Sequence, residues 1–140
     1  LVKSALAEAM SLEGDSAMAV RLIDECVEQI GRPDGQERLW LAEVLRRKAA
    51  ILMRTGRDAE AEVEFRAAID CARRQHARSW ELRSATGLAE LLASRGQTGD
   101  ARDLLSGVYS SFTEGADTRD LIEAGQLLQR ISVRATAGRT

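Results

Sequence analysis

The amino-acid sequence predicts an all-α protein, and three observations support this prediction. Alanine, leucine, glutamate and arginine dominate its 140 residues, and Pro33 is its single proline. This composition favours helix at nearly every position. Apolar residues recur at helical spacing without the alternation of strands, and glycines and helix-capping residues interrupt these runs at intervals.

The interruptions place the helix boundaries. Gly14-Asp15 separates the first helix from the second, and the turn at residues 31–35 ends the second. Thr55-Gly56 ends the third helix, and the side chain at Asp58 can cap the start of the fourth. Ser79 opens the fifth, residues 96–100 separate it from the sixth, and Gly115 precedes the seventh. We therefore expect helices at residues 2–13, 16–30, 36–54, 58–76, 79–95, 99–112 and 117–133.

The helices repeat in pairs. Gly14, Gly56 and Gly96 lie 42 and 40 residues apart, a spacing typical of a helical array. Seven residues before each glycine is an alanine, and five residues after it is another. Nine residues after each glycine is a large apolar residue. These equivalent positions are held by Ala7, Ala49 and Ala89, by Ala19, Ala61 and Ala101, and by Ile23, Phe65 and Leu105.

The clearest unit, AEVLRRKAAILMRTGRDAEAEVEFRAAI at residues 42–69, resembles the tetratricopeptide repeat. It differs from that family in a period longer than ~34 residues, in Lys48 at a usual leucine position, and in lacking the closing proline. The resemblance implies a tetratricopeptide-like (TPR-like) α-α superhelix of three antiparallel helix pairs and a C-terminal capping helix. We expect one helical-repeat domain over residues 1–140, with units at about 1–35, 36–77 and 78–115 and the capping helix at 116–133.

The sequence from Glu81 to Leu128 is also similar to the helical-repeat tail of large bacterial signalling proteins. The segments SWELR and VYSSFTEGADTRDL, with the repeat turn between them, carry this resemblance. It implies an upstream class III adenylate or guanylate cyclase, or a DNA-binding output domain of a transcriptional regulator, followed by an ATPase core. The start at Leu1 likewise suggests a fragment of a longer chain. No phosphate loop of the GxxxxGK[ST] kind occurs, so the resemblance implies context and no activity.

Charge and hydropathy exclude several classes of partner. Twenty basic and 22 acidic residues give a net charge of −2, so no strong field attracts nucleic acid or an anionic membrane. The sequence has no run of about 18 apolar residues that could span a membrane, and the stretch LVKSALAEAM lacks the long apolar block expected of a signal peptide. We expect a cytoplasmic protein that contacts neither nucleic acid nor membrane directly.

Catalytic and metal-binding chemistry is not expected. His76 is the only histidine, and no nucleophile and carboxylate in the sequence form a recognisable catalytic triad with it. We therefore interpret it as an exposed cation near a helix end. Cys26 and Cys71 lack metal or redox spacing and should be small buried residues. The stretch VYSSFTEGADTRDL lacks the ligand order of a calcium loop. We interpret it as a connection between two helices, in which Asp117 caps the second helix and Asp120 lies in the first turn of that helix. No cofactor is expected.

A basic run and a pair of tryptophans could each have either a structural or a ligand-binding role. The basic run at residues 46–48 is expected to be a solvated helix face whose charges pair with Glu37 and Glu43, rather than a surface that binds nucleic-acid phosphates. Trp40 and Trp80 occupy equivalent places, and we expect them to wedge between successive helix pairs rather than stack on a ligand.

The resemblance implies that the first helices of the pairs line a concave wall that holds a peptide, a protein partner or another domain of the same chain. Glu8, Ala50 and Glu90 stand where the family's carboxylate clamp has asparagine, so a receptor for chaperone tails is not expected. The predicted function is a non-catalytic protein-interaction and regulatory module. The alternatives are a small-molecule sensor and a structural or homodimerising scaffold. By family positions the wall comprises Ser4 and six candidate partner-binding residues, namely Glu8, Glu43, Arg46, Arg83, Thr86 and Glu90.

Overall fold

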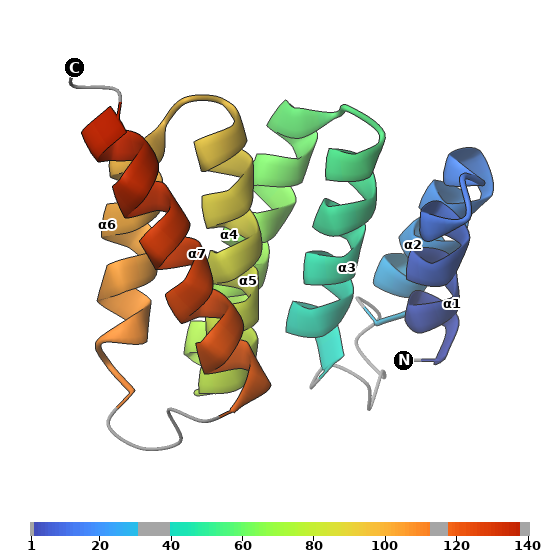
Figure 1. Ribbon diagram of the computed structural model, residues 1–140. Helices are drawn as coiled ribbons and strands as arrows, with labels where there is room; N and C mark the ends of the chain where they lie inside the picture. Colours follow the sequence, from blue (N-terminus) through green and yellow to red (C-terminus); the bar gives the residue numbers. More distant parts are fainter. Residues whose placement is uncertain (1, 31–39, 113–117, 138–140) are drawn as a thin grey trace.

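The protein is all-helical over the residues that its computed structural model describes, which are 2–30, 40–112 and 118–137 (Figure 1). This confirms the all-α part of the predicted fold class. None of the described helices is long and apolar enough to cross a membrane. This described part of the chain contains seven helices, which are α1 (Val2–Leu12), α2 (Ser16–Ile30), α3 (Leu41–Arg54), α4 (Asp58–Arg74), α5 (Arg78–Ser94), α6 (Thr98–Tyr109) and α7 (Arg119–Ala137).

Four of the turns between helices share one hydrogen-bonding pattern. In the α3–α4 turn, the N–H of Arg57 donates to the carbonyl of Leu52 at 2.9 Å, and that of Gly56 donates to Met53 at 3.2 Å. These two bonds form a Schellman motif, which needs a left-handed residue at its centre. Gly14, Gly56 and Gly96 supply it in three turns, with φ of 95°, 79° and 81°.

The α4–α5 turn has the same two bonds, but His76 holds the glycine position with φ of 55°. The N–H of Ala77 donates to Ala72 at 2.9 Å, and that of His76 donates to Arg73 at 3.1 Å. The sequence did not reveal this turn as a copy of the others, because the glycine that marks them is missing. The turn residues at 56, 76 and 96 are therefore evenly spaced along the chain.

The helix ends differ from prediction mainly in α7. This helix continues to Ala137, four residues beyond the expected end, because the apolar pattern stops at Val133 while helix-compatible residues follow. The hydroxyl of Thr136 donates to the carbonyl of Val133 at 2.8 Å. Asp117, the predicted N-cap, lies outside the described residues. The Thr118 hydroxyl instead accepts the N–H of Leu121, at 3.5 Å.

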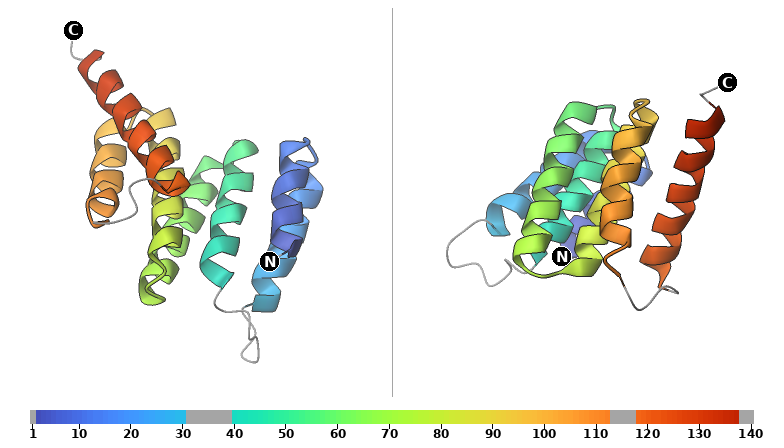
Figure 2. Two further views of the ribbon diagram at one scale, coloured as in Figure 1. Left: turned by 60° about the horizontal axis from the view of Figure 1, so that its bottom comes forward. Right: turned by 90° about the vertical axis from the view of Figure 1, so that its left-hand side faces the viewer.

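The helices form two layers. Helix α1 contacts α3, α3 contacts α5, and α5 contacts α7, whereas α2, α4 and α6 contact only odd-numbered neighbours within the described residues. Figures 1 and 2 show the resulting row of helices, with α7 inclined to the others. Within the odd-numbered layer neighbouring helices contact one another, whereas the described helices of the even-numbered layer do not. The odd-numbered layer is therefore the more closely spaced and forms the inner side of the row.

Small residues allow this spacing. The predicted alanines at positions 7, 49 and 89 are fully buried, as are those at positions 19, 61 and 101. Phe65 of α4 fills the space between α3 and α5, and a Cβ atom on Gly87 would collide with its ring. Gly87 therefore lets an aromatic ring lie against the backbone of α5.

The cysteines follow their predicted role, whereas of the two tryptophans only Trp80 packs against a core cluster. Cys26 and Cys71 are both buried, in separate apolar clusters, as expected. The rings of Trp40 and Trp80 lie 5.4 Å apart with their planes tilted by 48°. Trp80 packs against the cluster around Cys71, whereas Trp40 stays 39% exposed. The two equivalent tryptophans thus contact each other at the starts of successive units.

A candidate interaction groove on the odd-numbered helices

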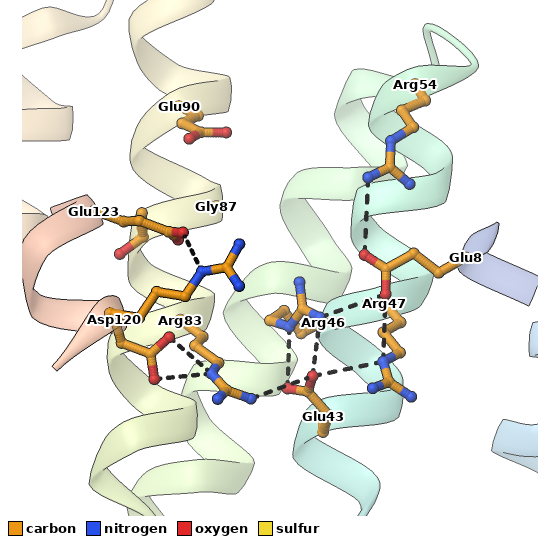
Figure 3. A pocket seen from close by; sticks show the side chains of 12 residues that line it. Glu8, Glu43, Arg46, Arg47, Arg54, Arg83, Gly87, Glu90, Asp120 and Glu123 are labelled. Carbon is orange, nitrogen blue, oxygen red and sulfur yellow. Dashed lines mark hydrogen bonds and ion pairs between the residues drawn. The ribbon is translucent and has the colours of Figure 1, made fainter. Parts of the chain in front are cut away.

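A groove of about 560 Å³ runs along the inner layer and receives side chains from α1, α3, α5 and α7 (Figure 3). Helical spacing explains its lining. Positions 43, 46 and 50 share one face of α3, and positions 83, 86 and 90 share the equivalent face of α5. The twelve lining residues are Glu8, Glu43, Arg46, Arg47, Arg54, Arg83, Thr86, Gly87, Glu90, Arg119, Asp120 and Glu123.

All six candidate partner-binding residues lie on this groove. Ser4, also expected on the wall, does not. It is completely buried, and its hydroxyl accepts a hydrogen bond from Nη1 of Arg47 at 2.7 Å. Half of the lining residues were not predicted from the sequence. Asp120 was expected only as a helix-end charge, although its spacing from Glu123 places both residues on one face of α7. The missed residues are Arg47, Arg54, Gly87, Arg119, Asp120 and Glu123.

Glu43 is the centre of the groove's ion pairs. Its side chain is only 5% exposed and accepts two hydrogen bonds from Arg46, from Nε at 3.0 Å and from Nη2 at 2.9 Å. Arg47 and Arg83 approach the same carboxylate at 3.5 and 3.8 Å. A buried carboxylate needs such partners. Glu43 is thus an internal anchor for three arginines, with little surface left for a partner molecule.

Glu8 extends the ion pairs to α1. Its carboxylate lies 3.3 Å from Nε of Arg47, 3.6 Å from Nη2 of Arg46 and 3.8 Å from Nη2 of Arg54. Burial by itself lowers the pKa of Arg46, but the hydrogen bonds that Arg46 donates to Glu43 and the nearby acidic charges outweigh it and raise that pKa. The guanidinium therefore remains charged, and it joins α1 to α3.

Arg83 extends the ion pairs in the other direction. Its Nε donates to both carboxylate oxygens of Asp120 on α7, at 3.0 and 2.9 Å. Charges of alternating sign therefore connect the four odd-numbered helices. A separate pair, Arg119 with Glu123 at 3.0 Å, lies on α7 itself.

The basic run at residues 46–48 pairs with Glu43 as predicted, but it does not form the predicted solvated face. The side chains of Arg46, Arg47 and Lys48 are only about a fifth exposed or less. Arg46 and Arg47 point into the groove, while Lys48 bridges Asp24 of α2 at 3.1 Å and Glu64 of α4 at 3.0 Å. Adjacent residues on a helix point in different directions, so the run divides between two faces. Glu37, one of its expected partners, lies outside the described residues.

Glu90 differs from every other carboxylate of the groove. It makes no hydrogen bond or ion pair within the described part of the chain, and Figure 3 shows no contact drawn to it. The Glu90 side chain is exposed to solvent, but other residues of the groove lie around it. Loss of hydration raises the pKa of Glu90; the charge of Glu123 raises it further and that of Arg130 opposes the shift. Thr86, on the same face, uses its hydroxyl to donate to the carbonyl of Leu82 at 2.8 Å.

The histidine and the oxygen-rich stretch are the remaining candidate features. His76 is exposed, as predicted, in the α4–α5 turn. Residues 113–117 of the oxygen-rich stretch lie outside the described residues, and Asp120 occupies the first turn of α7 as expected. Within 2–30, 40–112 and 118–137, no three histidine, cysteine or acidic side chains are grouped as metal ligands.

Compared with known proteins, the sequence matches no family model and no curated relative.

Proposed function

We propose that this chain is a non-catalytic interaction module of the tetratricopeptide-like kind, whose groove holds a segment of a partner protein or of another domain of the same chain. The observation that carries the proposal is the convergence of all six expected residues on one groove between four helices. Arrays of helix pairs present such inner surfaces to extended partners.

The charge of the groove defines the partner further. Five arginines and five carboxylates line it, so its formal charge is zero. Most of these charges already pair with one another, which holds the side chains in place before binding. The partner is therefore a polar segment that exchanges or extends ion pairs, and its affinity should fall with added salt.

Selection of binding peptides tests this function. A displayed library of random twelve-residue peptides is panned on the purified chain at low salt, and enriched peptides are measured by fluorescence anisotropy. Binding should weaken at least tenfold in Arg83→Ala, and should be unchanged in Glu28→Gln, which alters an exposed carboxylate on α2. Failure to enrich any peptide, or equal binding by the Arg83 variant, would contradict the proposal.

The wider context is proposed from the sequence resemblance alone. The segments SWELR and VYSSFTEGADTRDL support a place in the C-terminal repeat region of a bacterial cyclase or transcriptional regulator with an ATPase core. The reading frame upstream of the Leu1 codon in the source genome tests this. A cyclase or DNA-binding domain followed by a phosphate loop would support the proposal, and a start codon immediately upstream would contradict it.

A small-molecule sensor is a second candidate because part of the groove forms a recess of about 300 Å³. This volume lies at the lower end for ligand pockets, which are mostly apolar, whereas arginines and carboxylates dominate this groove. A thermal-shift screen of metabolites separates the two functions, since a tight ligand raises the melting temperature.

A structural or homodimerising scaffold is a third candidate, favoured by the outer face of α1. Ile51 and Leu91 are fully buried, but Ala9, at the equivalent position in the first unit, is exposed. Leu6 is 53% exposed, whereas the equivalent Leu88 is fully buried. Light scattering of the isolated chain, compared with Leu6→Glu, tests for a dimer through this face.

A further inference from the structure

The 300 Å³ recess combines an apolar floor with a charged rim. Its floor consists of Ala50 and Met53 of α3, Phe65 of α4 and Gly87 of α5. The ring of Phe65 reaches this place because Gly87 has no side chain in its way. The recess is therefore a product of the packing between three helices, and it lies between the two walls of the groove.

The rim carries two carboxylates and two arginines, which differ in the ion pairs that they make. Arg46 is hydrogen-bonded to Glu43, and Arg54 lies 3.8 Å from Glu8. Glu8 in turn faces three arginines. Glu90 has no such partner in the described part of the chain (Figure 3). It is therefore the rim charge that most favours a new partner of opposite sign.

Lysine and arginine side chains match both parts of this recess. Each has an apolar stem of methylene groups and a cationic head, and such stems lie readily on apolar surfaces. A stem on the floor would bury apolar area, while the head would supply the charge that Glu90 lacks. A carboxylate-bearing side chain would instead meet the like charge of Glu90.

We propose that the recess formed by Ala50, Met53, Phe65 and Gly87, with Glu90 on its rim, is a subsite for one lysine or arginine side chain of the bound partner segment. This inference rests on the proposed function and adds the chemistry of one partner residue. The stem of that residue lies on the apolar floor, and its head pairs with the Glu90 carboxylate.

Two binding-site variants and one charge reversal test the subsite. The probes are pools of N-acetylated, C-amidated decapeptides, each with one residue type fixed at a central position and the others randomised. Fixed lysine, arginine, norleucine and glutamate are compared by fluorescence anisotropy at low salt. The wild-type chain should bind the lysine and arginine pools about tenfold more tightly than the norleucine pool, the difference expected for one charged hydrogen bond.

Glu90→Gln should lose this preference, and Glu90→Lys should transfer it to the glutamate pool. Ala50→Leu, which fills the recess without altering a charge, should also reduce binding of the lysine pool. Glu28→Gln should behave as wild type. Circular dichroism and thermal melts confirm that each variant is folded before binding is measured.

The outcomes separate the two proposals. Peptide binding with no preference for lysine or arginine, or a preference that survives both Glu90 variants, would overturn the subsite and leave the groove function standing. Binding of no pool by the folded wild-type chain would overturn both.

Discussion

Arg83 of α5 donates its Nε hydrogen to both carboxylate oxygens of Asp120, at 3.0 and 2.9 Å, and thereby ties the last helix to the inner layer. The same guanidinium lies 3.8 Å from Glu43 of α3. One arginine thus contacts acidic residues on the helices before and after its own. The groove is therefore part of what holds neighbouring units in register.

The Arg83–Asp120 pair should stabilise the fold modestly, because Arg83 is partly exposed. In a double-mutant cycle of Arg83→Ala and Asp120→Ala, measured by urea unfolding, we expect a coupling energy of about 0.5–1 kcal/mol. The exposed pair Arg119–Glu123 is the control and should give about 0.3 kcal/mol. A coupling no larger than the control's would show that the pair does not tie α7 to α5.

Glu43→Gln should destabilise the protein far more than an exposed carboxylate change. The substitution keeps the shape of the side chain but leaves Arg46 and its neighbours without their buried counter-charge. We expect the free energy of unfolding to fall by about 3 kcal/mol, as when one partner of a buried ion pair is removed. Urea unfolding of this variant beside Glu28→Gln measures the effect, and equal stability of the two would contradict it.

Glu90→Gln should stabilise the protein at neutral pH. Because the pKa of Glu90 is raised in the folded state, the folded chain binds more protons than the unfolded chain between the ordinary and raised values. Stability therefore falls as pH rises through this window, and the loss persists above it. The variant lacks this loss. The free energy of unfolding of Glu90→Gln should exceed that of the wild type at pH 7.5, and the difference should shrink towards pH 4. Urea unfolding across that range measures it. An advantage independent of pH would contradict the assigned cause.

Ser84→Ala should stabilise the fold by about 1 kcal/mol. Ser84 is completely buried in α5, and its hydroxyl has no hydrogen-bond partner in the described structure. Alanine removes an unsatisfied polar atom and has the higher helix propensity. The matched variant is Ser4→Ala, which removes the acceptor of the Arg47 hydrogen bond and should destabilise. Thermal unfolding of both variants should show shifts of opposite sign.

His76→Gly should stabilise the α4–α5 turn by about 0.5–1 kcal/mol, since a left-handed conformation is costly for a residue with a Cβ atom. His76→Ala is the control, because it removes the imidazole but keeps the Cβ atom. Chemical unfolding should place the glycine variant above both wild type and the alanine variant. If the two substitutions have equal effects, the imidazole rather than backbone strain decides the stability of this turn.

Much of the groove could be predicted from sequence because it follows the repeat. Positions 43 and 46 and positions 83, 86 and 90 recur on one helix face once the turn glycines are aligned. The contribution of α7 was missed because it lacks such a glycine, and the turn at His76 was missed for the same reason. Ser4 was placed wrongly, since a register position shows which face a residue is on but not how deeply it is buried.

The sequence by itself determined the all-α class, most helix boundaries, the buried alanines and the side of the helices on which the groove lies, because these depend on local propensity and helical periodicity. Only the tertiary structure decided which charges pair. It buried Glu43 among three arginines, turned Lys48 towards α2 and α4, and left Glu90 beside an apolar recess with no ion pair to any described residue. Ion pairing depends on distances of a few ångströms between side chains on different helices, and these distances are fixed only when the helices pack.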